Sequence, residues 1–466
     1  MFARTTRAFR SRKCHFLQRR HVSLLETLKK RGFIQQLTRP EELNAALSTA
    51  SRVVYAGIDP TAGSLHIGHL LPLMCLLHFR LRGHTVIPLI GGATGLVGDP
   101  SGRKTEREPV NVKQVERNVA SLSQNVKQFL GRAFNYARTR LPSGTWVNSN
   151  FDLEVKSNLV WHKDYHMLDF LRTVGIHARV NTMLNRESVR SRLDSNTGLS
   201  FTEFTYQLLQ AYDFYYLHEN FQCTIQIGGS DQWGNIIAGL ELISRIKQDS
   251  ETEVFGITTP LLTTASGAKF GKSAGNAIWL DSDLTSIFDF YQYFLKVEDS
   301  EVEKYLKLFT MLPLAEITHI MDVHQRIPEG RTAQRRLADE VTELVHEEHG
   351  LQKAQRLTET MFRSAEARGK QLDVQSLLEA FEDDPRLKSC PLDELLGVSV
   401  MKLSSKYGLL PSTSAARQLI QSRGLYVNDK VVPEIHFTLG VDDLLDGRVA
   451  VIRAGKDKVL ILVAQS

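Results

Sequence analysis

The stretch that decides the fold of this chain is V-V-Y-A-G-I-D-P-T-A-G-S-L-H-I-G-H, residues 53–69. Val53–Ile58 is apolar and rich in β-branched residues, which predicts a short buried strand. Asp59-Pro60-Thr61 breaks that strand, and Ser64 is a candidate N-cap for a helix over Leu65–Leu77. The stretch therefore predicts a strand, a tight turn and a helix, which together begin an α/β unit.

Two histidines, His66 and His69, lie in the first turn of this predicted helix and share one of its faces. Imidazole N–H groups beside the positive end of a helix form a site for phosphate oxygens. A bare H-x-x-H would favour a metal-binding pair or two surface histidines. Gly68 between them allows a ligand to approach the helix backbone closely, which favours a nucleotide site.

A second apolar strand is predicted over Thr85–Ile90, and G-G-A-T-G-L-V-G-D-P-S-G-R follows it at residues 91–103. Strand, helix and strand in this order predict a parallel sheet that is covered by helices. Open α/β sheets bind ligands at the carboxyl ends of their strands. The glycine-rich segment is therefore a second candidate wall of a binding site, and a flexible turn is the alternative.

Three hydrogen-bonding side chains, Tyr206, Gln210 and Asp213, share one face of a helix predicted over Phe201–Phe214. A solvent-facing stripe carries charged residues more often, so this face predicts a polar pocket. A further strand, Cys223–Ile227, is followed by G-G-S-D-Q-W-G-N, residues 228–235, which is again a strand end opened by glycine.

The loop S-G-A-K-F-G-K-S at residues 266–273 brings two lysines, Lys269 and Lys272, among small residues. It is not a Walker A loop, because Gly267 and Gly271 are separated by one residue too few. Two lysines on such a loop can close over a triphosphate. A surface loop with lysines is the alternative.

Taken in order, these strings resemble the class I aminoacyl-tRNA synthetases, with H-I-G-H as their HIGH motif and K-F-G-K-S as a form of their KMSKS loop. The string Y-A-G-I-D-P-T-A-G-S-L-H-I-G-H-L and the 201–214 helix resemble the tyrosyl branch of bacterial type. The resemblance covers about residues 24–280. It implies a Rossmann-type α/β parallel-sheet catalytic domain over residues 22–282, with an insertion at about 120–200 that forms a homodimer interface and touches the tRNA acceptor stem.

The resemblance also implies three sets of site residues. The catalytic set, expected to contact the ATP phosphates, is His66, His69, Lys269, Lys272, Arg103 and Arg107, although the family often has lysine at the position of Arg103. The tyrosine-binding set is Tyr55, Asp99, Tyr206, Gln210, Asp213 and Gln232, with Asp99 receiving the α-ammonium and with Tyr55 and Asp213 binding the phenol. The ATP-binding set is Asp59, Gly68, Gln226, Gly229, Asp231 and Lys272.

The implied reaction joins L-tyrosine to AMP by attack of its carboxylate on the α-phosphorus of ATP. That carboxylate is already ionised at neutral pH, so no general base is needed, and catalysis rests on positioning and on stabilising phosphate charge. Mg²⁺ enters with ATP, and no resident metal ion or tightly bound cofactor is expected. A site that hydrogen-bonds a substrate hydroxyl rejects the analogue that lacks it, and tyrosine against phenylalanine is the established example.

Two further domains are expected after the catalytic one. Strand patterns stop at about residue 283, and residues 283–390 resemble an α-helical anticodon-contacting domain. Residues 391–466 resemble a small α+β RNA-binding module of the S4 type. Its candidate RNA contacts are Arg417, Gln421, Arg423 and Asn428. The segment has nine Lys or Arg against eight Asp or Glu, so its net charge gives little support to RNA binding.

The insertion is expected to be largely helical. Residues 106–132 predict a long polar helix, residues 134–148 an irregular and then strand-like segment, and residues 167–196 more helix. Five arginines lie in that last segment, and on composition alone they predict a solvated face. They are Arg172, Arg179, Arg186, Arg190 and Arg192.

The N-terminus predicts a mitochondrial transit peptide over residues 1–21, because the first 25 residues hold seven basic and no acidic side chains. A basic RNA-binding arm is the alternative. Without those seven basic residues, 50 basic and 52 acidic residues remain, so the net charge is no argument for nucleic-acid binding.

The expected location is the mitochondrial matrix and the expected RNA partner is mitochondrial tRNA(Tyr). The sequence has no run of about 18 apolar residues, so no contact with a membrane is expected.

Three alternatives to a tyrosyl enzyme remain open. A tryptophanyl synthetase shares the fold, but its pocket would not need Tyr55 and Asp213 as a phenol-binding pair. A small nucleotidyltransferase shares the H-x-G-H pattern, but would not need two further RNA-type domains. An RNA-binding protein acting in intron splicing is the third, although an inactive scaffold would be expected to have lost His66, His69 or Lys272.

Overall fold

The computed structural model describes residues 22–102, 111–142, 146–147, 153–194, 198–248, 252–262, 277–361, 374–382, 384–455 and 458–465. The predicted transit peptide lies outside these ranges. Within them, no helix is long and apolar enough to cross a membrane.

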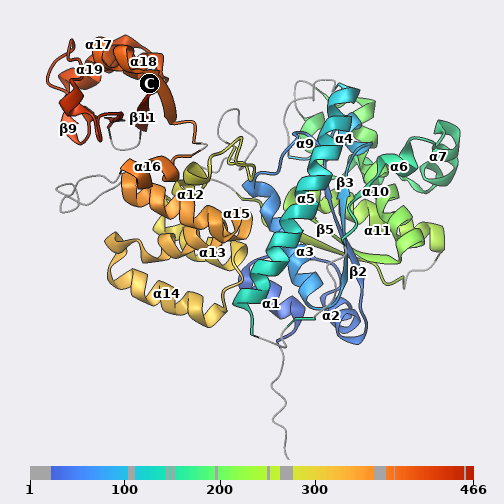
Figure 1. The fold of residues 1–466 in the computed structure, drawn as a ribbon. Coiled ribbons are helices and arrows are strands. Elements are labelled where there is room, and N and C mark those ends of the chain that lie inside the picture. Colours follow the sequence, from blue (N-terminus) through green and yellow to red (C-terminus); the bar gives the residue numbers. More distant parts are fainter. Residues whose placement is uncertain are drawn as a thin grey trace, which may run out of the picture.

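A six-stranded sheet forms the centre of the catalytic part, with the strand order β1-β6-β5-β2-β3-β4 (Figure 1). Its strands are β1 Gln36–Leu37, β2 Val53–Ile58, β3 Thr85–Ile90, β4 Lys156–Ser157, β5 Cys223–Gly229 and β6 Phe255–Thr259. Neighbours from β6 to β4 are parallel, and β1 pairs antiparallel with β6. The predicted parallel α/β fold is thus confirmed, and the carboxyl ends of five strands meet at one edge.

Helices cover both faces of this sheet (Figure 1). They are α1 Leu24–Arg31, α2 Pro40–Thr49, α3 Ile67–Leu81, α4 Thr94–Val97, α5 Val112–Arg140, α6 Leu159–His162, α7 Met167–Thr173, α8 Val180–Leu184, α9 Glu187–Leu193, α10 Phe201–Phe221 and α11 Trp233–Lys247. Helices α10 and α11 pack on each other and against β5.

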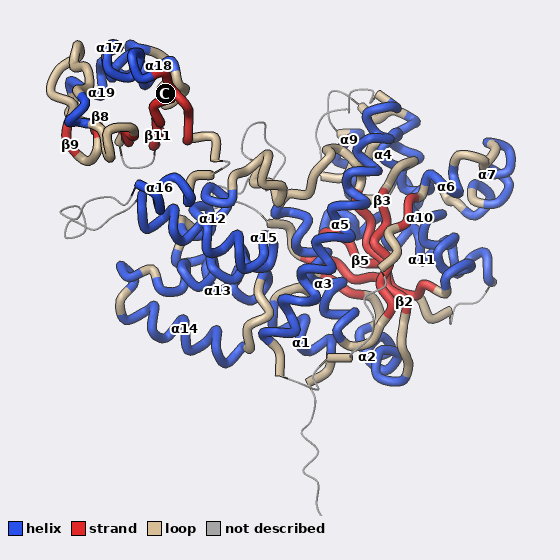
Figure 2. The backbone as a smooth tube through the Cα atoms, viewed as in Figure 1, coloured by secondary structure: helices blue, strands red, loops and turns tan. Residues whose placement is uncertain are grey.

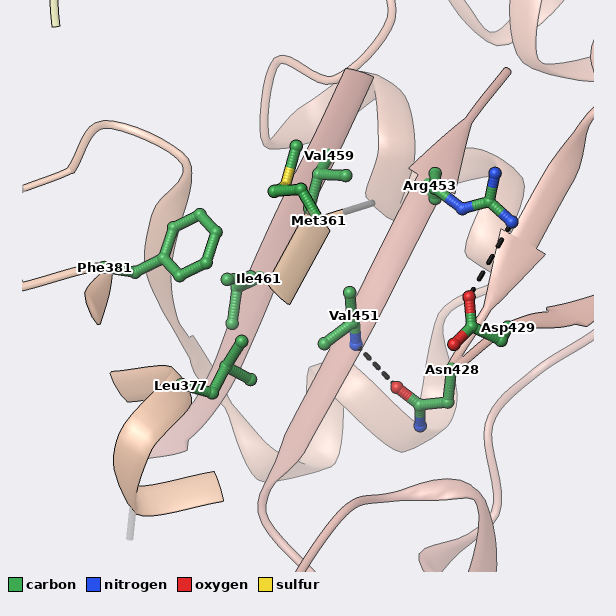
Figure 3. Close-up of a pocket in the computed structure, with 9 residues that line it drawn as sticks. All are labelled: Met361, Leu377, Phe381, Asn428, Asp429, Val451, Arg453, Val459 and Ile461. Carbon is green, nitrogen blue, oxygen red and sulfur yellow. Dashed lines mark hydrogen bonds and ion pairs between the residues drawn. The ribbon is translucent and has the colours of Figure 1, made fainter. Parts of the chain in front are cut away.

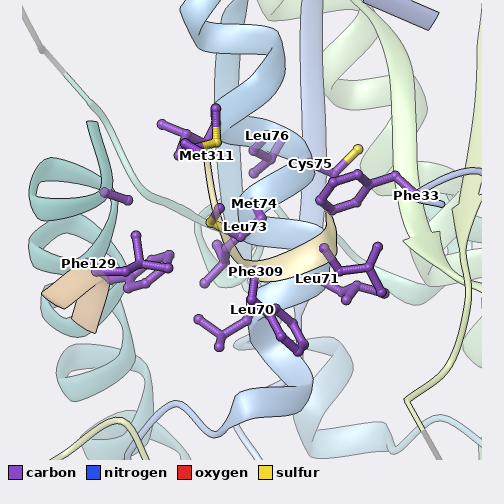
Figure 4. Packing of buried hydrophobic residues seen from close by; sticks show 14 of the residues in the cluster. Phe33, Leu70, Leu71, Leu73, Met74, Cys75, Leu76, Phe129, Phe309 and Met311 are labelled. Atoms are coloured by element: carbon purple, nitrogen blue, oxygen red, sulfur yellow. The ribbon is translucent and has the colours of Figure 1, made fainter. Parts of the chain in front are cut away.

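Helix α3 is the centre of the largest apolar core (Figure 4). It packs on strands β2 and β3 on one side and on α5 and α13 (Asp299–Phe309) on others. Phe33, Phe129 and Phe309 surround it, and eleven of its fifteen residues are buried. A helix enclosed on every side must be apolar nearly all round, and its fixed position holds the histidines at its start.

The start of α3 differs from the prediction. Its N-cap is His66 rather than Ser64, and its first residue is Ile67. Residues 65–67 pair in an antiparallel bridge with residues 278–280, through hydrogen bonds of 3.0 Å from Ile67 N to Ile278 O and 2.8 Å from Leu280 N to Leu65 O. This long-range pairing keeps the backbone extended at His66 (φ −121°, ψ 168°), so the helix begins two residues later than predicted.

Two predictions about the insertion are wrong. Helix α5 continues to Arg140, so residues 134–140 are helical rather than irregular. Arg186 and Arg192 are not on a solvated face: Arg192 is fully buried in an ion pair with Glu203 (2.8 Å), and Arg186 donates to the Gly234 carbonyl. The arginine pattern could not show this, because the acceptors lie on other helices, α10 and α11.

A helical part follows the sheet. Its helices are α12 Ile287–Leu295, α13 Asp299–Phe309, α14 Leu314–Arg326, α15 Thr332–Met361 and α16 Val374–Ala380. Buried Arg31 of α1 joins it to the catalytic part by donating to the carbonyls of Thr310 (2.8 Å) and Leu312 (2.6 Å). Tyr136 of α5 adds a hydrogen bond to buried Glu340 of α15 (2.5 Å).

The C-terminal part is a five-stranded sheet, ordered β7-β11-β10-β8-β9, with helices on one face (Figure 2). Its elements are β7 Leu387–Pro391, α17 Leu392–Gly397, α18 Val400–Lys406, α19 Thr413–Gln421, β8 Leu425–Val427, β9 Lys430–Val431, β10 Val449–Ala454 and β11 Lys458–Gln465. The predicted α+β character is confirmed. Since β7 pairs with β11, this sheet begins at Leu387, ahead of the expected boundary at residue 391.

Candidate functional site

A cleft of about 480 Å³ lies at the carboxyl ends of β2, β3, β5 and β6. Thirteen of the predicted site residues line it, from strand ends, from the start of α3 and from one face of α10. They are Tyr55, Asp59, His66, Gly68, His69, Asp99, Tyr206, Gln210, Asp213, Gln226, Gly229, Asp231 and Gln232. The other four, Arg103, Arg107, Lys269 and Lys272, lie outside the described residues.

Asp213 of α10 is a deeply buried carboxylate of the cleft, and it is only 2% exposed. Its Oδ1 accepts from Trp161 Nε1 and from His162 Nε2, each at 2.8 Å. Its Oδ2 accepts from Asn158 Nδ2 at 2.9 Å. Among the described residues, these three donors satisfy the buried carboxylate, and no arginine or lysine donates to it.

Sequence reasoning missed these three donors. They follow β4, a strand of only two residues, which is too short to produce an alternating pattern. The available indication was the string S-N-L-V-W-H at residues 157–162, which places a polar residue directly after a strand end, as at the other strands of this sheet.

Tyr55 of β2 brings a second polar group to the same end of the cleft. The ring is almost fully buried, and its hydroxyl has no hydrogen-bond partner among the described residues. Burial, and then the charge of Asp213, raise the pKa of this phenol well above its usual value. The hydroxyl therefore stays neutral and can pair with a ligand. Gln226, predicted for ATP, pairs with Tyr55 across β2 and β5, so it lies beside the residues predicted for tyrosine.

Asp59 and Tyr206, which were predicted for different ligands, are joined. Tyr206 donates to Asp59 Oδ2 at 2.9 Å, and Thr94 Oγ1 donates to Asp59 Oδ1 at 2.8 Å. Burial, and then the neighbouring Asp59, raise the pKa of Tyr206 well above its usual value. A Cβ on Gly91 would lie 2.1 Å from Asp59 Oδ1, so this first residue of the glycine-rich segment must be glycine.

A third cluster forms around Asp99. Its carboxylate accepts from the backbone N–H of Ser101 (2.9 Å), from the Ser101 hydroxyl and from Gln232 Nε2 (2.7 Å). Asn235 Nδ2 lies 3.2 Å from both the Gln232 and the Gln210 side-chain oxygens. Carboxylate and amide oxygens that converge in this way form a site for a cationic group.

His66 and His69 are held as a stacked pair, with ring centroids 3.8 Å apart. His66 Nδ1 accepts from the Gly68 N–H and His69 Nδ1 accepts from the His66 N–H, each at 3.1 Å. Because both Nδ1 atoms are acceptors, the neutral rings carry their protons on Nε2. The His66 ring also lies 5.9 Å from Trp279, a further cleft residue that sequence reasoning missed.

Three of the four predicted RNA contacts are exposed on the C-terminal part. Arg417, Gln421 and Arg423 are exposed on and just after α19. Asn428 differs, because both groups of its amide are used inside the domain: Nδ2 donates to Asp443 O (2.6 Å) and Oδ1 accepts from Val451 N (2.9 Å). With a φ of 45°, Asn428 acts as a turn residue, and the RNA contact predicted for it lacks support.

Comparison with known proteins identifies the family. Residues 48–363 match the family described as tRNA synthetases class I (W and Y). The chain is 42% identical over 441 residues to tyrosine–tRNA ligase 1 of Bacillus subtilis, which covers 95% of this chain and 99% of that protein. The human mitochondrial tyrosine–tRNA ligase is 40% identical over 449 residues, covering 94% of this chain and 91% of that protein. The chain belongs to the tyrosyl-tRNA synthetases.

A solved tyrosyl-tRNA synthetase also shares this fold. The C-terminally truncated mitochondrial enzyme of Aspergillus nidulans superposes with a TM-score of 0.66 at 36% identity, covering 73% of this chain and 94% of that one. The resemblance to the tyrosyl-tRNA synthetases that the motifs indicate is therefore confirmed.

Proposed function

We propose that this chain activates L-tyrosine with ATP and Mg²⁺ in the mitochondrial matrix and transfers it to mitochondrial tRNA(Tyr). Its family is that of the tyrosine–tRNA ligases, which are class I aminoacyl-tRNA synthetases. The observation that carries the proposal is that a buried carboxylate, Asp213, lies close to a buried hydroxyl, Tyr55, that has no hydrogen-bond partner among the described residues.

In this proposal the substrate phenol lies between those two groups. Asp213 accepts a hydrogen bond from the phenol and Tyr55 donates one to its oxygen, so phenylalanine would leave the Tyr55 hydroxyl unpartnered and one acceptor direction of Asp213 unfilled. The α-ammonium group goes to Asp99, with support from Gln210, Tyr206 and Gln232. The converging oxygens around Asp99 support that role.

ATP occupies the rest of the cleft. The Nε2 atoms of His66 and His69 donate to phosphate oxygens, and the accepting Nδ1 atoms support that assignment. Lys269, Lys272, Arg103 and Arg107 hold the leaving pyrophosphate. Mg²⁺ enters as part of the nucleotide substrate. Asp59, Gly68, Gly229 and Asp231 contact the nucleoside and the α-phosphate, and Gln226 is shared with the tyrosine end.

A homodimer is proposed through the insertion. Helices α7 to α9 and the start of α10 expose an unusual number of large apolar side chains. They are Met167, Leu168, Leu171, Ile176, Val180, Leu184, Leu193 and Phe201. Leu168 and Phe201 are 73% and 72% exposed. A surface of this kind indicates contact with another protein, and the insertion is where the family's dimer interface is expected.

Two further arguments support the location and the RNA partner. The acid-free basic N-terminus fits mitochondrial import, and the human and Aspergillus relatives are named as mitochondrial enzymes. The exposed Arg417, Gln421 and Arg423 of the C-terminal part supply a surface for tRNA.

The proposal is tested by ATP–pyrophosphate exchange without tRNA, on protein that lacks the first 21 residues. Tyrosine alone should support exchange, and phenylalanine and tryptophan should not. Asp213→Ala should lose most activity and its preference for the phenol. Exchange with tryptophan would move the chain to the sister synthetase, and exchange with none of the three would favour an RNA-scaffold role.

A further inference from the structure

The three donors to Asp213 are distributed unevenly over its two oxygens. Trp161 and His162 both donate to Oδ1, and Asn158 donates to Oδ2. A carboxylate oxygen accepts about two hydrogen bonds through its lone pairs. Oδ1 is therefore saturated by protein, whereas Oδ2 has one acceptor direction left for a ligand.

We infer that His162 is a positioning residue that saturates Oδ1 and so turns the free lone pair of Oδ2 toward the substrate hydroxyl. This inference rests on the proposed reading of the phenol by Asp213, and it adds a residue that sets the discrimination between tyrosine and phenylalanine. Because an ionised carboxylate only accepts hydrogen bonds, Nε2 is the protonated nitrogen of His162 in this pair.

The surroundings of His162 suit a fixed donor. It is the last residue of α6, and its side chain is 8% exposed. The imidazole packs edge-on against Tyr212 at 5.5 Å between centroids, and Tyr212 stacks on Tyr165 at 4.9 Å. The imidazole therefore packs against an aromatic pair while its Nε2 donates to Asp213 at 2.8 Å, and this packing supports the hydrogen bond.

Removal of this donor has a specific consequence. Oδ1 would regain a free lone pair. A hydroxyl or a water could then donate to either Oδ1 or Oδ2 of the buried carboxylate, rather than to Oδ2 alone. Binding of tyrosine weakens, and the penalty for phenylalanine falls because water can take the place of the missing hydroxyl. His66 and His69 lie at the start of α3, whereas His162 ends α6, so binding at the ATP end should be unaffected.

The test compares two substitutions of His162 whose side chains are of nearly equal size. Both are made in the chain that lacks its first 21 residues. His162→Gln keeps an N–H donor at about the position of Nε2, and His162→Met fills the same space without a donor. His218→Met is the matched control, since His218 lies on the same helix as Asp213 and makes a comparable bond to Cys223 O (3.0 Å) outside the cleft. The measurement is pyrophosphate exchange with tyrosine or phenylalanine and with ATP varied.

In His162→Met the KM for tyrosine should rise about tenfold and the ratio of kcat/KM for tyrosine over phenylalanine should fall about tenfold, as expected for one charge-assisted hydrogen bond. The KM for ATP should stay within about twofold. His162→Gln should recover most of both losses, and His218→Met should match the wild type. Should His162→Met fold poorly, His162→Asn, whose amide stops short of Oδ1, replaces it.

Wild-type KM and discrimination in His162→Met would overturn the inference and leave the proposed function standing. Equal losses in His162→Gln and His162→Met would also overturn it, because ring packing rather than the donor would then be responsible. Absence of tyrosine exchange in the wild-type chain would instead reject the proposed function, and the inference with it.

Discussion

At the scale of single residues, the buried carboxylates of the cleft have hydrogen-bond donors, whereas one buried hydroxyl beside them has no hydrogen-bond partner among the described residues. Asp213 has three donors, yet Tyr55, its neighbour, has no partner among the described residues. A buried polar group without a partner costs stability. Such a group is tolerated where a ligand supplies the missing bond, which is the condition that the phenol of tyrosine would meet.

Tyr55→Phe should therefore separate binding from stability. Loss of one neutral hydrogen bond should raise the KM for tyrosine about fivefold. Stability should stay equal or increase by about 1 kcal/mol, because an unpaired buried hydroxyl is removed. Exchange kinetics and urea unfolding without tyrosine measure the two effects. A destabilised variant with an unchanged KM for tyrosine would show that the hydroxyl is a structural group instead.

At the scale of elements, α15 contains a break in its helical backbone at a residue that is neither glycine nor proline. Glu347 has φ 61° and ψ 178° inside the helix, a backbone conformation that is almost confined to glycine. The residue joins two helical segments beside the catalytic part, where it pairs with Arg132 at 3.4 Å. Because this pair is largely exposed, it offsets little of the backbone strain.

Glu347→Gly should raise the free energy of unfolding by about 1 kcal/mol, since glycine adopts this conformation without strain. Glu348→Gly is the matched control: it lies one residue further in helical backbone, and glycine there should cost about 1 kcal/mol. Thermal and urea unfolding of the two variants give the comparison. Equal destabilisation by both would mean that position 347 is helical in solution.

At the scale of the whole molecule, the C-terminal sheet packs on both of its faces. Along β11, Leu460 and Leu462 pack with the domain's own helices, whereas Val459 and Ile461 face the helical part. Figure 3 shows Ile461 and Val459 opposite Leu377, Phe381 and Met361. These residues line a small cavity of about 30 Å³. The second face therefore attaches the C-terminal domain to α16.

Ile461→Glu should release the C-terminal domain without unfolding it, because a charge cannot remain at this apolar contact without a cost of several kcal/mol. Leu462→Glu, the adjacent control, should unfold the domain instead. Small-angle scattering should show a larger radius of gyration for Ile461→Glu, and circular dichroism should show a loss of structure only for Leu462→Glu. Tyrosine-dependent exchange without tRNA should be unchanged in Ile461→Glu, and identical behaviour of both variants would contradict the two-faced packing.

Acid should destabilise the molecule through its buried histidines. Burial, aided by Arg132, lowers the pKa of His346 from 6.5 to about 4, and burial lowers that of His84 to a similar value. The unfolded chain takes up the proton near pH 6.5 and the folded chain only near pH 4. Stability is therefore complete above pH 6.5 and is lost as pH falls toward 4, by on the order of 3 kcal/mol for His346.

His346→Gln should remove that share of the acid dependence, so its free energy of unfolding should fall less than the wild type's between pH 7 and pH 4.5. His349→Gln, an exposed neighbour three residues on, is the control and should keep the wild-type slope. Urea unfolding at a series of pH values measures both. An unchanged slope in His346→Gln would mean that this imidazole reaches solvent in the folded state.

Prediction from sequence succeeded where a residue's surroundings are set by its near neighbours in the chain. The parallel strands, the buried helix after residue 66 and the polar stripe of Tyr206, Gln210 and Asp213 all follow from local periodicity. Prediction failed at the start of α3, where distant residues 278–280 pair with residues 65–67. It failed also at Arg192, whose partner Glu203 no periodicity could identify.

The sequence by itself therefore determined the class of fold and the strand ends at which the polar side chains of the cleft gather. Only the tertiary structure decided which of those side chains touch. It placed Asn158, Trp161 and His162 on Asp213, joined Asp59 to Tyr206, and turned one face of the C-terminal sheet toward α16. The physical reason is range: helix and strand periodicity act over a few residues, whereas a buried carboxylate takes its donors from whatever the packed sheet brings within about 3 Å.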